Sequence, residues 1–161
     1  MDKIKQVIEA IEANTQEYIV IAIDGRCASG KTTLANKLAQ HFHANVFHMD
    51  DYFLRKEQRT KERLSEIGGN VDRERFIEEV ASKLHSNADI IFAPLDCKTM
   101  ALKEKRTVKQ THVTIIEGSY AMHPALRKYY DYLIYLTIDP QTQQKRLYER
   151  NPEKYDDFVN R

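Results

Sequence analysis

The chain has 161 residues, of which 25 are basic and 24 are acidic, and its formal net charge is +1. This length fits one domain with a core of ordinary size, so we expect residues 1–161 to form a single domain. The near-neutral charge gives no global field that would favour nucleic acid or an anionic membrane as a partner.

The apolar runs are far shorter than the roughly 20 residues needed to span a bilayer, and the first residues do not open a signal peptide. We therefore expect a cytoplasmic protein without a membrane partner. Its two cysteines make neither a disulfide framework nor a CxxC metal pair. The sequence leaves the oligomeric state open, and a homo-oligomer is compatible with it.

The first predicted element is an amphipathic helix over residues 2–16. Its apolar residues recur at i, i+3, i+4 and i+7, and they are Ile4, Val7, Ile8 and Ile11. The apolar, β-branched run over 18–23 then predicts a parallel strand that is buried on both faces. Leu34, Leu38 and Phe42 recur at helical spacing after it.

Between this strand and this helix, residues 25–32 read GRCASGKT and satisfy G-x-x-x-x-G-K-[ST], the phosphate-binding loop of P-loop NTPases. Glycines let the backbone N–H groups turn inward toward phosphate oxygens, while the lysine reaches the phosphates and the threonine hydroxyl reaches Mg²⁺. A glycine-rich turn before an ordinary helix is the alternative, which the flanking strand and helix disfavour. The candidate nucleotide-binding residues are Gly25, Arg26, Cys27, Ala28, Ser29, Gly30, Lys31, Thr32 and Thr33.

Asp50 and Asp51 directly follow a short predicted strand over 44–49. In a doubly wound sheet this places them at the carboxyl edge, beside the phosphate loop. A turn-forming role is the alternative, above all for one of the pair. The charged stretch 54–70 reads as a mobile, solvated loop at the mouth of the site. Asp72 is a plausible N-cap for a helix whose apolar face carries Phe76, Ile77, Val80 and Leu84.

Residues 89–110 predict a small β-hairpin inserted before the next core strand, with strands over 90–96 and 106–109. Pro94 indicates that the first of them is an edge strand. The β-branched strand that follows, over 113–119, ends in Glu117 and Gly118. In P-loop proteins a strand beside the phosphate loop ends in a carboxylate of the Mg²⁺ shell, and Glu117 fits that place. A surface glutamate is the alternative.

His123 and Pro124 begin a short predicted helix, and residues 132–138 form the last predicted core strand. Asp139 and Pro140 then begin a helix over 140–151. This helix carries Lys145, Arg146 and Arg150. A basic lid that folds over transferring phosphates and a solvated amphipathic helix explain these residues equally well.

Taken together, the phosphate loop, the MDDYF stretch over 49–53, Leu95-Asp96-Cys97, the EGSY stretch over 117–120 and the basic last helix resemble the uridine kinase family of P-loop kinases. Nicotinamide riboside kinases and phosphoribulokinases share parts of this set. The resemblance covers most of the chain, from Ile19 to about Arg150. It implies an α/β, three-layer P-loop NTPase fold with a parallel sheet flanked by helices and a small β-hairpin insert.

The resemblance also implies roles for individual residues. Asp50 corresponds to the carboxylate that accepts the proton of the substrate hydroxyl and helps to hold the metal, and Asp51 is secondary to it. Thr32 and Glu117 match the magnesium positions, and Lys31 matches the phosphate lysine. The implied substrate-binding residues are Asp51, Phe53 and Asp96, and the implied lid over 140–161 carries Arg146 and Arg150.

The implied activity is a Mg-ATP-dependent kinase that transfers the γ-phosphoryl group to a hydroxyl of a small molecule, with a nucleoside as the first expectation. Leu95 and Met100 stand where the family carries a tyrosine and a histidine that contact the nucleobase. Relatives continue beyond the lid, so we expect the adenine contacts from that side to be absent or supplied differently. A P-loop ATPase or a nucleotide-dependent switch without a small-molecule acceptor remains the alternative, and the choice between ATP and GTP is open.

Overall fold

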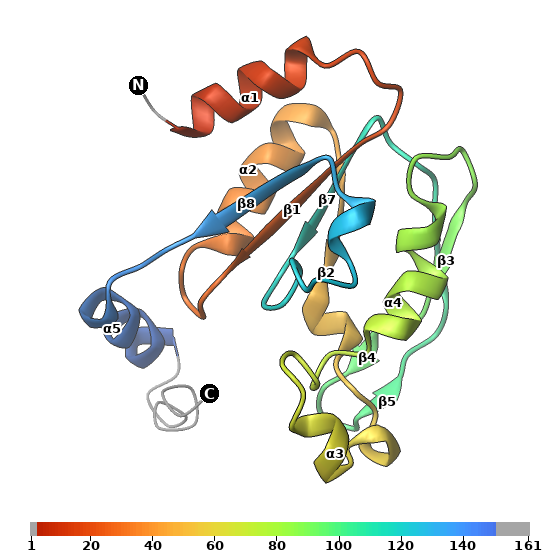
Figure 1. Cartoon of the computed structure of the whole chain (residues 1–161), viewed down its shortest axis with the longest axis vertical. Coiled ribbons are helices and arrows are strands. Elements are labelled where there is room, and N and C mark those ends of the chain that lie inside the picture. Colours follow the sequence, from red (N-terminus) through yellow and green to blue (C-terminus); the bar gives the residue numbers. More distant parts are fainter. Residues whose placement is uncertain (1–2, 151–161) are drawn as a thin grey trace.

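Every residue of β1 (Ile19–Gly25) is buried, as its continuous apolar run predicts. The computed structural model, which describes residues 3–150 apart from the side chain of Arg150, places β1 inside a four-stranded sheet of order β2-β7-β1-β8 (Figure 1). The other strands are β2 (Asn45–His48), β7 (Val113–Glu117) and β8 (Tyr132–Leu136). All three pairings are parallel, so the carboxyl ends of the strands share one edge.

The two faces of the sheet carry separate cores because successive side chains of a strand point to opposite faces. Ile19, Ile21 and Ile23 pack with residues of α2 (Lys31–Phe42) and with Ile11 of α1 (Lys3–Ala13). Val20 belongs to the second core, on the side of α4 (Arg73–Glu79). The sheet is thus covered by helices on both faces, which confirms the predicted fold class.

β8 lies at one edge of this sheet and is less buried than the predicted core strand. Its residues alternate between half-buried and exposed, and Leu133 and Tyr135 are 46% and 57% exposed. The short helix expected from His123 begins later, as a 3-10 turn, η4 (Arg127–Tyr129). Within the described range, no helix is long and apolar enough to cross a membrane.

The stretch 54–70, predicted to be a mobile loop, instead contains a 3-10 turn, η2 (Lys56–Gln58), and a one-turn helix, α3 (Lys61–Leu64). Arg63 holds it in place. Its guanidinium donates to both carboxylate oxygens of Glu74 at 2.6 and 2.8 Å, and to the carbonyls of Gly69 and Val71 at 3.0 and 2.8 Å. The segment is therefore tied to the first turn of α4.

Asp72 caps α4 as predicted, because its side chain accepts a hydrogen bond from the backbone N–H of Arg75. The helix is shorter than expected. It ends at Glu79, where Val80 leaves helical dihedrals with φ −121° and ψ −63°, and a 3-10 turn, η3 (Ala81–Lys83), follows. Phe76 and Val80 still reach the core on this side of the sheet.

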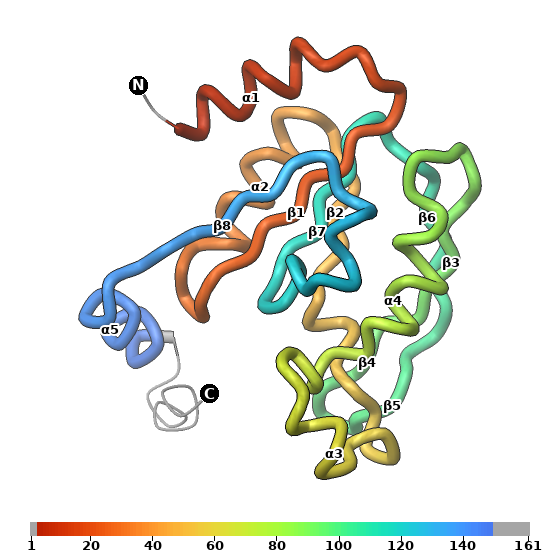
Figure 2. Tube along the Cα trace, viewed as in Figure 1, coloured from red at the N-terminus to blue at the C-terminus, as the bar shows by residue number. Residues whose placement is uncertain are grey.

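The predicted hairpin is present, but it consists of two short ladders. β3 (Ile90–Phe92) pairs with β6 (Arg106–Val108), and β4 (Leu95–Asp96) pairs with β5 (Ala101–Leu102), all antiparallel. Pro94 separates β3 from β4; it has no N–H to donate, and its carbonyl accepts from Lys103 at 2.8 Å. The trace in Figure 2 shows β3 and β6 running alongside α4.

Candidate active site

The turn from β1 into α2 requires a glycine at its first position. Gly25 has φ +152°, and a Cβ added there would lie 2.4 Å from the carbonyl oxygen of Leu136 and 2.8 Å from Ser29 Oγ. The turn ends at Gly30, which precedes Lys31, the first residue of α2, and offers no side-chain cap. The first N–H groups of α2 are therefore left for an anion, which the helix dipole also favours.

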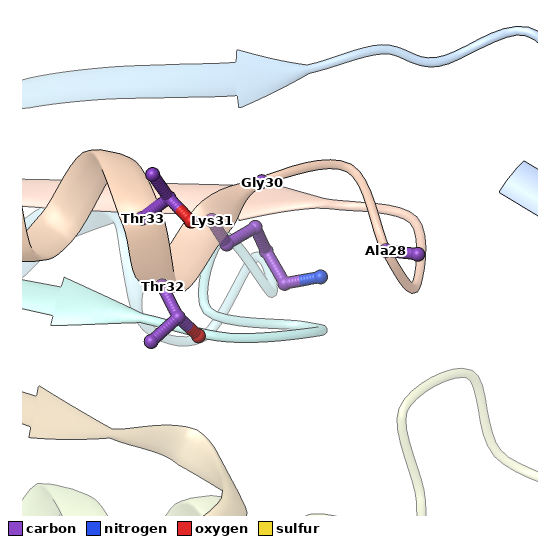
Figure 3. A pocket seen from close by; sticks show the side chains of 5 residues that line it. All are labelled: Ala28, Gly30, Lys31, Thr32 and Thr33. Carbon is purple, nitrogen blue, oxygen red and sulfur yellow. The ribbon is translucent and has the colours of Figure 1, made fainter. Parts of the chain in front are cut away.

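Lys31 arches over this turn, as Figure 3 shows. Its ammonium donates to the carbonyls of Gly25 and Arg26, both at 2.9 Å. The hydroxyl of Ser29 is buried and finds no hydrogen-bond partner in the described part of the chain. An open pocket of about 60 Å³ is lined by Ala28, Gly30, Lys31, Thr32 and Thr33. These are the features of a preformed phosphate site, so the residues fit a nucleotide phosphate chain.

Asp24, which the sequence analysis missed, fixes the position of this turn relative to β7. One carboxylate oxygen accepts from the N–H groups of Gly25 at 2.6 Å and Tyr120 at 3.2 Å, and the other accepts from Met122 at 2.9 Å. Because Asp24 is buried, these bonds hold the loop after β7 against the start of the phosphate loop. The available signal was a single charged residue near the end of an otherwise apolar strand.

Glu117, predicted from the sequence, has a partner that sequence reasoning missed, His48, at the carboxyl ends of β7 and β2. His48 and Glu117 are direct partners in the parallel register, and His48 Nδ1 lies 2.5 Å from Glu117 Oε1. This hydrogen bond raises the pKa of His48 above its ordinary value, although partial desolvation opposes the rise. Glu117 itself is 5% exposed. The only sequence feature that could have indicated this pair is that each residue is the last of its strand.

Asp50 and Asp51 lie on a 3-10 turn, η1 (Met49–Tyr52), directly after β2. Asp50 remains accessible to solvent, yet enough protein surrounds it for desolvation to raise its pKa, and the negative charge of Glu117 adds to the rise. The positive charges of Lys31 and His48 oppose it. Lys31 and Glu117 therefore each lie close enough to Asp50 to act on its carboxyl, at the same edge of the sheet.

Arg75 of α4 holds η1 in place, a role that no sequence motif signalled. Its guanidinium donates to the carbonyl of Asp51 at 2.9 Å and to the carbonyl of Ala93 at 2.5 Å. It also lies over the ring of Tyr52, 4.2 Å from the centroid. With its side chain 10% exposed, Arg75 links α4, η1 and the hairpin in one buried contact.

The other predicted substrate residues lie near η1. Phe53 is partly buried against the core and forms an isolated bridge with Val71. One carboxylate oxygen of Asp96 accepts from the backbone N–H of Lys98, so it also shapes the turn of the hairpin. Cys97 Sγ lies 3.9 Å from the carbonyl oxygen of Asp50. The hairpin therefore reaches the aspartate pair.

α5 (Pro140–Arg150) contacts the phosphate loop through side chains. Gln143 donates to the carbonyl of Cys27 at 3.1 Å, and Arg146 donates to the carbonyl of Ala28 at 3.0 Å. Asp139 caps the helix by accepting from the N–H of Thr142. Arg146 thus lies at the phosphate site. The side chain of Arg150 and residues 151–161 of the predicted lid lie outside the described part of the chain.

The residues predicted to hold Mg²⁺ are Thr32, Asp50 and Glu117. The described residues contain no group of three or more His, Cys, Asp or Glu side chains that could hold a metal ion alone. Mg²⁺ usually keeps several waters and takes one or two carboxylates together with substrate phosphates. An exposed threonine on the first turn of α2 and the carboxylates of Asp50 and Glu117, which act on one another, fit such a site.

Comparison with known proteins shows what the chain resembles. Uridine kinase-like protein 4 of Arabidopsis thaliana is 25% identical over 156 residues, and the match covers 92% of this chain and 33% of that protein. The chain thus spans about a third of the length of this curated relative. A scan against models of known protein families finds no match.

Two solved structures share the fold over nearly the whole chain. A possible uridine kinase from Bacillus stearothermophilus is 26% identical with a TM-score of 0.71, covering 98% of this chain and 90% of that one. A candidate fructose transport system kinase from Silicibacter sp. is 23% identical with a TM-score of 0.76, covering 98% and 84%. The predicted resemblance to uridine kinase-like proteins and the predicted P-loop fold are confirmed.

Proposed function

We propose that this uridine kinase-like chain is a kinase that transfers the γ-phosphoryl group of Mg-ATP to a hydroxyl group of a small molecule. The observation that carries the proposal is the position of Asp50. Its carboxyl lies at the same sheet edge as the phosphate loop and within electrostatic reach of both Lys31 and Glu117. A protein that only binds nucleotide has no need of a base beside the phosphate lysine.

In the proposed reaction Asp50 accepts the proton of the acceptor hydroxyl, whose oxygen forms the new bond to the γ-phosphorus as the bond to the ADP oxygen breaks. The raised pKa of Asp50 makes it a stronger base than a free aspartate. Lys31 and the N–H groups at the start of α2 stabilise the phosphate charge. Arg146 lies close enough to the loop to contribute as well.

Mg²⁺, when bound, would neutralise charge on the phosphate oxygens. Thr32, Asp50 and Glu117 are the residues that would hold it or its water shell. The hydrogen bond from His48 holds one oxygen of Glu117, so its other oxygen would be the one to bind the metal or its water.

The test compares Asp50→Asn with Asp51→Asn, which removes a neighbouring carboxylate of the same turn. ATP-analogue affinity is measured by calorimetry, and ADP and phosphorylated product are measured with a mixture of nucleosides, sugars and hydroxy acids. We expect Asp50→Asn to bind the analogue normally but to lose about 10²–10⁴-fold in turnover, and Asp51→Asn to lose much less. Near wild-type turnover of Asp50→Asn would refute the assigned base.

A nucleotide-dependent ATPase or switch is the second candidate. The residues at the two positions where the uridine kinase family contacts the nucleobase favour this candidate, because they offer a base no hydrogen bond. Leu95 is 3% exposed, and Met100 has no polar group. An acceptor screen with γ-labelled ATP separates the two functions. A labelled small molecule supports the kinase, whereas release of labelled phosphate alone supports the switch.

A further inference from the structure

The strands and turns of the hairpin carry an excess of basic residues in an almost neutral chain. Residues 90–110 contain five basic and two acidic side chains, a net charge of +3, against +1 for all 161 residues. The basic residues are Lys98, Lys103, Lys105, Arg106 and Lys109. A cluster of like charges is usually only part of a solvated surface. Whether this one can bind a ligand therefore depends on the direction in which its side chains point.

Arg106 lies on the inner face of the hairpin. It is the direct partner of Phe92 in the antiparallel ladder, and such partners share one face of a sheet. Phe92 is 8% exposed and packs edge-on against Phe47 of β2 at 5.3 Å between ring centroids. Ile91, on the opposite face, is 46% exposed. The side chain of Arg106 therefore extends on the side of the hairpin that faces β2 and η1.

The hairpin as a whole is anchored beside η1. Arg75 joins the carbonyls of Ala93 and Asp51, as described above, and Lys103 is tied to the same end of the hairpin through its bond to Pro94. Arg106, on the inner face, and Lys103, whose backbone is bonded to Pro94, thus belong to the part of the hairpin that Arg75 holds beside η1.

Neither Arg106 nor Lys103 forms an ion pair with any carboxylate of the described residues. Both side chains are exposed. Two cations on the η1 side of the hairpin, with no carboxylate of the described residues within ion-pair distance, suit a ligand that brings its own negative charge. A neutral nucleoside would leave both of them without a partner, and buried Leu95 offers its base no hydrogen bond.

Resting on the proposed function, we propose that the acceptor is an anionic hydroxyl compound whose carboxylate or phosphate group is bound by Arg106 and Lys103 while its hydroxyl faces Asp50. The guanidinium is suited to this role because its planar fork donates two parallel hydrogen bonds to either anion. The reaction remains the proposed one: the hydroxyl proton passes to Asp50 and the anionic group takes no part in bond formation.

The first experiment uses matched acceptor pairs that differ only in charge. Glycerate is compared with glycerol, and ribose 5-phosphate with ribose, with uridine as the neutral nucleoside; ADP release and product mass are measured. We expect kcat/KM for the charged member of at least one pair to exceed that for its neutral partner and for uridine by tenfold or more. The pair that responds distinguishes a carboxylate from a phosphate.

Preferential phosphorylation of uridine, glycerol or ribose would overturn the anionic acceptor while leaving the kinase in place. ATP hydrolysis without phosphorylation of any compound would instead refute the kinase, and with it this inference. The two failures are therefore distinguishable in one assay.

The second experiment removes single charges from the hairpin. Arg106→Gln and Lys103→Gln should each raise the KM for the charged acceptor about tenfold, the loss expected for a charge-assisted hydrogen bond, with the KM for ATP unchanged. Lys109→Gln is the matched control, because Lys109 is an exposed hairpin cation that follows Val108, at the opposite end of the β3–β6 ladder from Arg106. An equal effect of Lys109→Gln would show that only overall charge matters and would overturn the proposal. Thermal unfolding checks that each variant is folded.

Discussion

Gly118 is the residue whose replacement gives the sharpest test of the site geometry. It follows Glu117 at the end of β7 and has φ +140°. A Cβ added to Gly118 would lie 2.7 Å from Cβ of Met49, and 3.2 Å from both Cγ and the backbone nitrogen of that residue. Met49 begins η1, the turn that carries Asp50. Gly118→Ala must therefore strain its own backbone and also displace the turn with the proposed base.

The expected destabilisation has two parts. A side chain at this φ costs on the order of 1–3 kcal/mol of backbone strain. Inserting a methyl group against a packed side chain and backbone costs about 1–3 kcal/mol more. The sum is about 2–6 kcal/mol; with an unfolding entropy of about 2.1 cal/mol/K per residue, the midpoint of a 161-residue chain should fall by about 6–18 °C.

Chemical and thermal unfolding measure this loss, and Gly30→Ala provides the control. Gly30 also has a left-handed φ, +96°, but a Cβ there would meet nothing within 4 Å. It therefore carries the strain without the overlap, and we expect it to lose only about 1–3 kcal/mol. If Gly118→Ala proves no less stable than Gly30→Ala, the proposed collision with Met49 is wrong. In the folded fraction, Gly118→Ala should also lower turnover, since η1 is displaced.

Three further predictions concern charges at the site. In the absence of Mg²⁺, His48→Gln should lower the thermal unfolding temperature most below about pH 6.5. The difference from the wild type should fade as pH rises through the raised pKa of His48, and a difference that is the same at every pH would contradict the pair with Glu117. Arg75→Lys keeps the charge but loses the two separate guanidinium nitrogens that reach the carbonyls of Ala93 and Asp51, so urea unfolding should show a loss of about 2 kcal/mol. Unchanged stability would remove its role in holding η1. The acid limb of the kcat/KM profile should lie above the free-aspartate value of 3.8, because burial raises the pKa of Asp50, and an acid limb absent down to that value would argue against Asp50 as the base.

The phosphate loop could be read from the sequence because its determinants are contiguous. The strand that ends at Gly25, the turn and the helix that begins at Lys31 follow one another directly, so local periodicity and one motif specify all three. Asp24 escaped this reading even though it lies in the same stretch. Its function depends on the N–H groups of Tyr120 and Met122, which only the parallel pairing of β1 with β7 brings within reach.

The acceptor side was predicted less well because its contacts join distant parts of the chain. His48 meets Glu117 through strand register, and Arg75 meets Asp51 and Ala93 through helix packing. No local pattern encodes such pairings. The charged composition of 54–70 suggested a mobile loop, but long-range bonds from Arg63 to Glu74 and to the backbone order it. The sequence predicted the hairpin correctly but not its division into two ladders at Pro94. The second ladder forms because β4 pairs with β5, and β5 lies within the predicted turn.

The acceptor side of the site can change in sequence more freely than the phosphate loop. The hairpin forms its own two-stranded ladders and shares no strand with the central sheet. It reaches the proposed base through a few contacts, chiefly the carbonyl of Ala93 held by Arg75 and the approach of Cys97 to Asp50. Substitutions on its inner face, such as those at Arg106, can therefore alter which acceptor is bound while the phosphate loop and Asp50 keep their positions.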